Sequence, residues 1–276
     1  MLWHVDGCAE IDHRRDPGGL HLLVDIARIS SPCAHVRWHG YAASALVMST
    51  THEEYVPPGR GDVLTVASER VGITNGLLLK FPQIHGVGDF SLLQRPRIAI
   101  VGARKATQEG RRRAAQLARD CARAGVVVVS GLAEGVDYAA HTAAIEHGGG
   151  TIAVIGTPLD KVYPTKHGAL QRRIYHEHLL LSPFTWGDKF VPSNFPERNR
   201  IMARLALATV IIEASDTSGS LHQAAESVQV GRPVFIAAGM LEDAKLSWPK
   251  RFIGDDKPLG RVLRTTSDVI DFALAT

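Results

Sequence analysis

The stretch that most constrains the fold is residues 126–141, VVVVSGLAEGVDYAAH. Four valines in a row, without polar alternation, are typical of a strand that is buried on both faces of a parallel sheet. Ser130 and Gly131 then turn the chain, and the residues from Asp137 onward predict a helix with Asp137 as its N-cap. Gly131 and Gly135 let backbone N–H groups approach an anion beside the first turn of this helix. The pattern predicts a phosphate-binding turn, although a turn that binds nothing has the same pattern.

The same order of strand and helix continues along the chain after residue 97. Apolar runs that favour strands lie at 98–102, 126–129, 151–156, 179–182, 209–214 and 233–237, with helical patterns at 108–123, 137–145, 195–206, 221–230 and 269–274. This alternation predicts an α/β domain with a doubly wound, mostly parallel sheet over residues 97–276. Residues 1–96 have a weaker pattern, with a helix at 20–29 and strands at 34–38 and 63–66. We expect them to form a smaller N-terminal region of uncertain fold, which ends near residues 86–96.

Composition narrows the class of protein. With 45% hydrophobic and 21% charged residues, the 276-residue chain has the composition of a soluble globular protein. It contains no secretory signal pattern and no apolar run near the roughly 20 residues that cross a bilayer. We therefore expect a cytoplasmic protein without a membrane partner. The three cysteines lack paired spacing and no histidine pair has ligand spacing, so neither a disulfide framework nor a metal site is expected.

The charge is uneven along the chain. Residues 97–276 carry 23 Lys and Arg against 18 Asp and Glu, whereas residues 1–96 carry 8 against 10. This basic excess permits a polyanionic partner. Arg104 and Lys105 directly follow the first strand of the α/β domain, where open sheets bind ligands. The GxGxxG fingerprint is missing, since Gly102 is followed by Ala103-Arg104, and this argues against an NAD enzyme.

Three further segments supply candidate anion contacts. Arg198-Asn199-Arg200 begins a helix, and two arginines that flank an asparagine suit bidentate contacts to oxygen atoms. Ser218-Gly219-Ser220 opens the next helix and forms a second serine/glycine cradle. Lys161 and Lys166 lie in an irregular loop, with Tyr163 between them as a candidate stacking surface. The full set of predicted DNA- or phosphate-binding residues is Gly102, Arg104, Lys105, Ser130, Gly131, Gly135, Lys161, Lys166, Arg198, Asn199, Arg200, Ser218, Gly219 and Ser220.

Taken together, the segments VGARKAT, SGLAEGVDYAAH, TIAVIGTPLDKVYP, FPERNRI, VIIEA, SGSL and GRPVF resemble, in this order, the DprA/Smf family of DNA-processing proteins. The resemblance covers residues 97–276 and implies an extended Rossmann-like domain that binds single-stranded DNA without strong sequence preference. It also implies a homodimer that helps to load a strand-exchange recombinase onto incoming DNA during natural transformation. Most of the predicted anion contacts, together with His141, lie at positions that match the family's DNA-backbone pocket or hold its shape.

The chain also departs from the family's pattern. Family members read GSR where this chain has residues 102–104, and SGSLITA where it has residues 218–224, so a hydroxyl is lost at each place. Residues 1–96 do not clearly match the amino-terminal helical module of the family, and we expect no winged helix after Thr276. Contacts that family members make through those modules are therefore not assumed for this chain.

Two other functions use similar cradles. Lonely-guy-like nucleotide phosphoribohydrolases cleave an N-glycosidic bond with a PGGxGTxxE signature, which residues 218–226 and the arginines of the RNR triplet imitate only loosely. A sensor domain for a small nucleotide second messenger is the second alternative. Asp137 and His141 lie one helical turn apart, yet no nucleophile or metal ligand accompanies them in the sequence. We therefore expect a binding protein with no catalytic residue and no cofactor.

Overall fold

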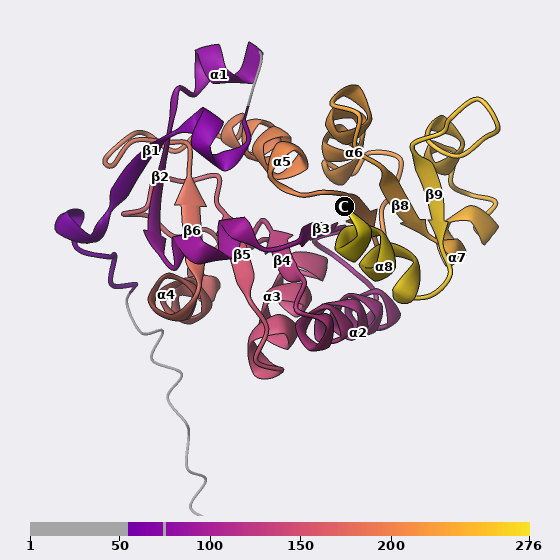
Figure 1. The fold of residues 1–276 in the computed structure, drawn as a ribbon, viewed down its shortest axis with the longest axis horizontal. Helices are drawn as coiled ribbons and strands as arrows, with labels where there is room; N and C mark the ends of the chain where they lie inside the picture. Colours follow the sequence, from indigo (N-terminus) through magenta and orange to yellow (C-terminus); the bar gives the residue numbers. More distant parts are fainter. Residues whose placement is uncertain (1–54, 74–75) are drawn as a thin grey trace, which may run out of the picture. The chain divides into compact units, whose positions relative to one another are not determined.

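A nine-stranded sheet organises the part of the chain that the computed structural model describes, residues 55–73 and 76–276. The strands are β1 (Leu64–Ala67), β2 (Gln83–Gly88), β3 (Arg97–Val101), β4 (Val127–Ser130), β5 (Thr151–Val154), β6 (Leu179–Ser182), β7 (Thr209–Ile211), β8 (Val234–Ala237) and β9 (Gly260–Leu263). Their order is β1-β2-β6-β5-β4-β3-β7-β8-β9 (Figure 1). The seven strands from β6 to β9 in this order are parallel, and β2 pairs antiparallel with both β1 and β6.

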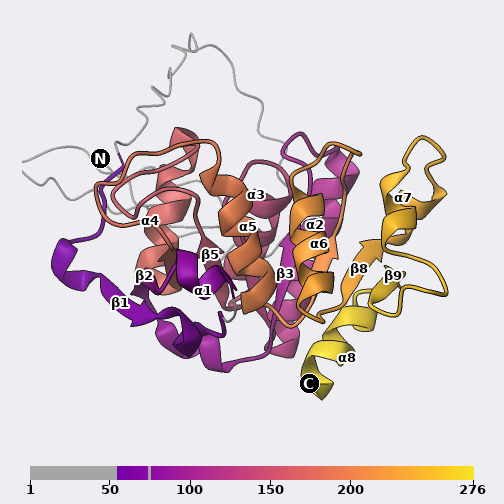
Figure 2. The same cartoon turned by 90° about the horizontal axis from the view of Figure 1, so that it is seen from above.

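Helices cover both faces of the parallel part of the sheet (Figures 1 and 2). One face carries α2 (Gln108–Ala124), α3 (Val136–Glu146), α4 (Gly168–Glu177) and α8 (Ser267–Ala275), and the other carries α5 (Asn194–Leu205) and α6 (Ser220–Gln229). Two short helices, α1 (Gly76–Lys80) and α7 (Ala238–Glu242), add Leu77 and Met240 to the apolar cluster on the side of α5 and α6. Single 3₁₀ turns occur at Arg60–Asp62, Ser68–Val71, Phe90–Gln94, Thr165–His167 and Trp248–Arg251.

Alternate residues of the parallel strands supply two apolar layers. In β3, Ile98 and Ile100 pack with α2, α3 and α8, whereas Ala99 and Val101 pack with α5 and α6. All four side chains are buried, as expected for a strand with an uninterrupted apolar run between two helical layers. The doubly wound, mostly parallel α/β fold that the sequence predicts is thus confirmed.

α2 illustrates how the local sequence sets the ends of an element. The Thr107 side chain accepts the N–H of Gly110 (3.0 Å), which is an N-cap, and the helix stops at Gly125, whose φ is 77°. Its buried face consists of Gly110, Ala114, Leu117, Ala118 and Cys121. α2 begins a few residues after the carboxyl end of β3, where the predicted site lies.

β1 and β2 come from the region that precedes residue 97. Ile84 and Val87 of β2 are buried, and Val87 lies opposite Leu180 of β6. The strand predicted at 63–66 is confirmed, with a shift of one residue. The domain boundary near residues 86–96 stays a prediction; the structure adds that residues 64–88 and 97–263 contribute to one sheet. The helix predicted at 20–29 and the strand predicted at 34–38 lie outside the described residues.

Within residues 55–73 and 76–276, no helix combines the length and the apolar character that a membrane crossing requires. The longest of these described helices, α2, has a strongly charged exposed face that includes Arg111, Arg112 and Arg113.

Candidate functional site

The order of the strands reverses between β3 and β7. These strands are neighbours, yet the chain continues from β3 through β4, β5 and β6 on one side and from β7 through β8 and β9 on the other. Ligands of open α/β sheets bind beyond the carboxyl ends of the strands at such a switch point. An open cavity of about 760 Å³ lies here, lined mainly by residues within 101–113, 195–202 and 212–223. We call this cavity the crevice.

The crevice brings together predicted residues from three segments that are far apart in the sequence. Arg104 and Lys105, in the loop after β3, are both exposed. Asn199 of α5 donates from Nδ2 to the backbone oxygen of Gly219 (3.1 Å), and so ties α5 to the turn before α6. The predicted residues that line the crevice are Gly102, Arg104, Lys105, Arg198, Asn199, Ser218, Gly219 and Ser220.

Six of the predicted residues do not line the crevice: Ser130, Gly131, Gly135, Lys161, Lys166 and Arg200. The Lys161 ammonium donates to the backbone oxygen of Asp188, and Lys166 forms an ion pair with Glu134 (2.9 Å). Ser130 is buried and its hydroxyl donates to the backbone oxygen of Ile100 (2.7 Å). These side chains therefore do not line the crevice.

Arg200 also lies away from the crevice. Its guanidinium lies 3.3 Å from Glu226 and 3.7 Å from Glu197, in a smaller cavity between α1, α5 and α6. The physical reason is helical geometry, since residues i and i+2 of a helix do not share a face. Arg198 and Arg200 therefore cannot act as the pair that the RNR triplet suggested.

Arg198 fills the space that Gly131 leaves by lacking a side chain. A Cβ on Gly131 would overlap with the guanidinium, and Arg198 is only 3% exposed. The nearest acid is Asp137, whose Oδ2 lies 3.8 Å from Arg198 Nη1. Burial lowers the pKa of Arg198 to about 10, so the side chain stays charged at neutral pH. Gly131 thus makes room for a buried cation.

Asp137 does not have the predicted role of N-cap. α3 begins at Val136 with Gly135 in the capping position, and the Asp137 carboxylate instead accepts the backbone N–H groups of Gly131 (3.2 Å) and Ala133 (3.4 Å). Burial raises the pKa of Asp137, while the charge of Arg198 and these two N–H groups act in the opposite direction. The residue holds the loop between β4 and α3 in place beside Arg198.

Gly135 lets the loop before α3 lie close against the loop after β3. Its φ is 76°, and a Cβ there would overlap with the backbone oxygens of Ala103 and Arg104. The N–H of Val136 donates to Ala103 O (3.3 Å). The anion position predicted at the start of α3 is therefore occupied by backbone carbonyl groups of the loop after β3.

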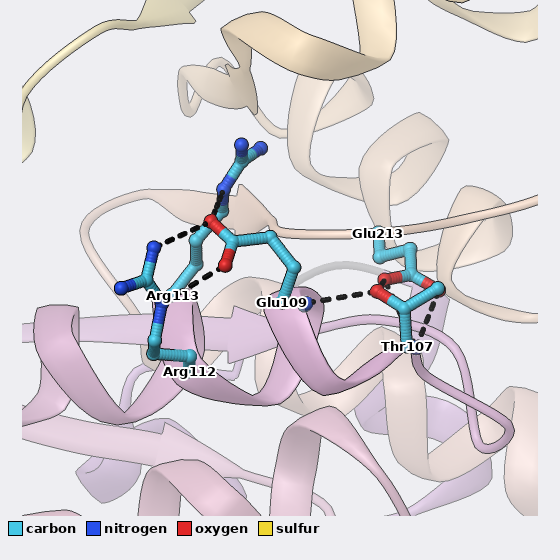
Figure 3. Close-up of polar contacts among 6 residues, drawn as sticks. Thr107, Glu109, Arg112, Arg113 and Glu213 are labelled. Carbon is cyan, nitrogen blue, oxygen red and sulfur yellow. Dashed lines mark hydrogen bonds and ion pairs between the residues drawn. The ribbon is translucent and has the colours of Figure 1, made fainter.

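Glu213 lines the crevice, but sequence reasoning did not single it out. From the end of β7 its carboxylate accepts the N–H of Thr107 (3.0 Å) and the Thr107 hydroxyl (2.6 Å), as Figure 3 shows. The sequence contained one signal, an acid directly after the apolar run VII at residues 210–212. Its partner is 106 residues away in the chain, so the contact itself had no local signature.

An aromatic cluster borders the same region. The rings of Tyr163, Phe190 and Phe195 lie with centroids 5.2 to 5.5 Å apart, and Tyr163 remains 44% exposed. The Arg104 guanidinium lies over the Phe195 ring, 4.7 Å from its centroid. Tyr163, predicted as a stacking surface, is thus part of a partly exposed platform of rings with a cation beside it.

Comparison with known proteins agrees with this architecture. A family model described as DNA recombination-mediator protein A matches residues 80–272. The chain belongs to this family. The crevice residues named above all fall within the matched range, and so does the aromatic cluster. The resemblance to DprA/Smf proteins is therefore confirmed.

This chain aligns with only part of the length of individual relatives in the family. DNA processing protein DprA of Streptococcus pneumoniae (strain ATCC BAA-255 / R6) is 40% identical over 156 residues, which is 56% of this chain and 55% of that protein. Protein Smf of Escherichia coli (strain K12) is 35% identical over 165 residues, which is 59% of this chain and 42% of that protein. The chain spans about half the length of the curated relatives it matches.

Solved structures of the family have the same fold. The X-ray structure of DNA processing protein A from Streptococcus pneumoniae aligns with a TM-score of 0.63 and 33% identity, over 72% of this chain and 70% of that chain. DNA processing protein A from Helicobacter pylori, whose single-stranded DNA binding mode is known from its structure, aligns with a TM-score of 0.65 and 27% identity. That alignment covers 77% of this chain and 96% of the Helicobacter pylori chain.

Proposed function

We propose that the chain binds single-stranded DNA along the crevice and acts as a recombination mediator. The observation that carries this proposal is the convergence of Arg104, Lys105 and the turn at Ser218–Ser220 in one open cavity. Cations and serine/glycine turns suit the phosphates of a strand. The membership in the DNA recombination-mediator protein A family supports the same conclusion.

The turn before α6 is suited to a phosphate oxygen. Ser220 is 7% exposed and lines the crevice, and its hydroxyl has no hydrogen-bond partner among the described residues. A buried hydroxyl without a partner is costly, so a ligand that accepts its hydrogen bond is favoured. The first turn of a helix adds a positive dipole end at the same point.

The aromatic platform favours single strands over duplex. Unpaired bases can stack on rings such as Tyr163 and Phe195, and such stacking tolerates any base. In a duplex the bases are stacked on each other and their faces are covered. We therefore expect a preference for single strands without strong sequence preference, as the family resemblance also implies.

We further propose that the chain forms a homodimer and acts together with a strand-exchange recombinase. A homodimer would place two crevices on one strand and raise the overall affinity through the second contact. The family description as a recombination mediator supports the further proposal that the bound strand is passed to a strand-exchange recombinase. Light scattering tests the dimer, and a strand-exchange assay with purified recombinase tests the transfer.

The N-glycosidase alternative lacks support from the geometry. Glu226, the acid that it requires, is 5% exposed and forms ion pairs with Arg204 and Arg200 in the smaller cavity between α1, α5 and α6. It is therefore separated from Arg198 and from the turn before α6 that would hold the substrate.

The mutational test uses fluorescence anisotropy with a labelled oligothymidine at low salt. Arg104→Ala should weaken binding about tenfold, because one exposed cation that also lies over Phe195 is lost. Arg123→Ala is the matched control, since Arg123 is exposed near the far end of α2, about 24 Å along the helix from Thr107. Equal affinities for the two variants would contradict the proposal that the crevice is the binding site.

A further inference from the structure

The position that a dinucleotide would use in this fold is already filled. In Rossmann-type sheets a pyrophosphate binds at the N-terminus of the helix that follows the first parallel strand. In this chain that helix is α2, which follows β3. The N–H group of Thr107, at the N-cap of α2, donates instead to both carboxylate oxygens of Glu213, at 3.0 and 3.2 Å.

The surrounding residues are shaped for this carboxylate. A Cβ on Gly110 would overlap with Glu213 Oε2, and a Cβ on Gly102 would lie 2.8 Å from the Glu213 backbone oxygen. The Thr107 hydroxyl donates to Glu213 while it accepts the N–H of Gly110 (3.0 Å). Gly110 and Thr107 thus accommodate the carboxylate, and Gly102 lets the Glu213 backbone approach, so the contact belongs to the packing of the fold.

A second acid, Glu109, lies in the first turn of α2. Glu109 is held by Arg112 (2.9 Å) and Arg113 (2.9 Å), as Figure 3 shows, and these hydrogen bonds lower its pKa. Glu109, Glu213 and Asp243 line the crevice together with Arg104, Arg113 and Ser220. The Ser220 hydroxyl has no hydrogen-bond partner among the described residues. Because two arginines hold Glu109, the carboxylate that takes the N–H group at the start of α2 is that of Glu213.

We propose that Glu213 is a specificity-determining residue, whose carboxylate takes the place of a nucleotide pyrophosphate at the start of α2. The crevice then rejects nucleoside diphosphates and dinucleotides, and the phosphates of a strand lie along Arg104 and the turn before α6. The second half of this inference rests on the proposed function, whereas the rejection of pyrophosphate does not. It also separates the strand-binding proposal from the nucleotide-sensor alternative.

The test measures binding of inorganic pyrophosphate and of ADP by isothermal titration calorimetry. Glu213→Ala removes both the charge and the occupied volume, and we expect it to bind both probes at least tenfold more tightly than the unsubstituted protein. Glu213→Gln keeps an amide oxygen for the Thr107 N–H and removes only the charge, so a smaller gain in the same direction is expected. This second variant keeps the test valid if the alanine variant does not fold.

Glu146→Ala is the matched control for the Glu213 variants. Glu146→Ala removes an exposed carboxylate at the end of α3, away from the crevice, and should not gain binding of either probe. A gain in the control equal to that of the Glu213 variants, or no gain in a folded Glu213 variant, would overturn the inference. Oligothymidine binding, measured in parallel, should be retained in Glu213→Gln. Absence of oligothymidine binding in the unsubstituted protein would refute the proposed function but leave the pyrophosphate result interpretable.

Discussion

His141 gives a prediction whose size follows from its burial. The imidazole is 0% exposed in α3, and its Nδ1 lies 2.7 Å from the Thr151 hydroxyl, which itself donates to Val128 O. Because the Thr151 hydroxyl proton is already donated to Val128 O, Nδ1 of His141 must be protonated and donate to the Thr151 oxygen. Burial lowers the pKa of His141 to about 3, and the positive charge of Arg198 acts in the same direction.

The sign of the pH dependence follows from linkage. An unfolded histidine titrates near pH 6.5, so below this pH the unfolded chain binds a proton that folded His141 does not bind until about pH 3. The free energy of unfolding should therefore be fully present above pH 6.5 and fall as the pH decreases. Between pH 7.5 and 5.0 the loss from this one group is about 2 kcal/mol.

Urea unfolding at these two pH values measures the effect. Other histidines also titrate, so the loss is compared with that of His141→Asn, whose amide nitrogen can replace Nδ1 as the donor to Thr151. The unsubstituted protein should lose about 2 kcal/mol more than the variant between pH 7.5 and 5.0. Equal losses in the two proteins would refute the argument that His141 is buried and neutral.

Two further predictions concern the buried cation of the crevice. Asp137→Ala should lower the free energy of unfolding by about 3 kcal/mol or more, because it leaves Arg198 buried without its acid; a loss of about 1 kcal/mol in urea unfolding would instead match a simple helix cap. Gly131→Ala should cost about 1–3 kcal/mol, since its Cβ overlaps with the Arg198 guanidinium. The matched control is Gly61→Ala, where no atom lies within 4 Å of the added Cβ, and similar losses for both alanines would contradict the packing argument.

Much of the fold could be predicted because its strands are locally distinctive. Runs such as 126–129 and 179–181 are apolar at every position, since both faces of a central parallel strand are covered by helices. Residues that directly follow such strands lie at one edge of the sheet. For this reason Arg104 and the turn at 218–220 could be placed in a common site from the sequence alone.

What could not be predicted depends on contacts between distant segments. Gly131 looked like a phosphate-binding glycine, because nothing near it in the sequence indicates that Arg198 occupies the adjacent space. The contact between Glu213 and Thr107 has the same character. Helical geometry alone places the two arginines of the RNR triplet on different faces of α5. Which of them faces the crevice depends on how α5 packs on the sheet.

The most direct test of the central claim locates a bound strand on the protein. An oligothymidine that carries 4-thiothymidine is bound at low salt and irradiated, and the crosslinked peptides are identified by mass spectrometry. We predict crosslinks at Tyr163, Phe190 or Phe195, beside Arg104, and their loss when unlabelled single strand, but not an equal amount of duplex, is added. Crosslinks confined to other surfaces, or equal competition by duplex, would contradict the account.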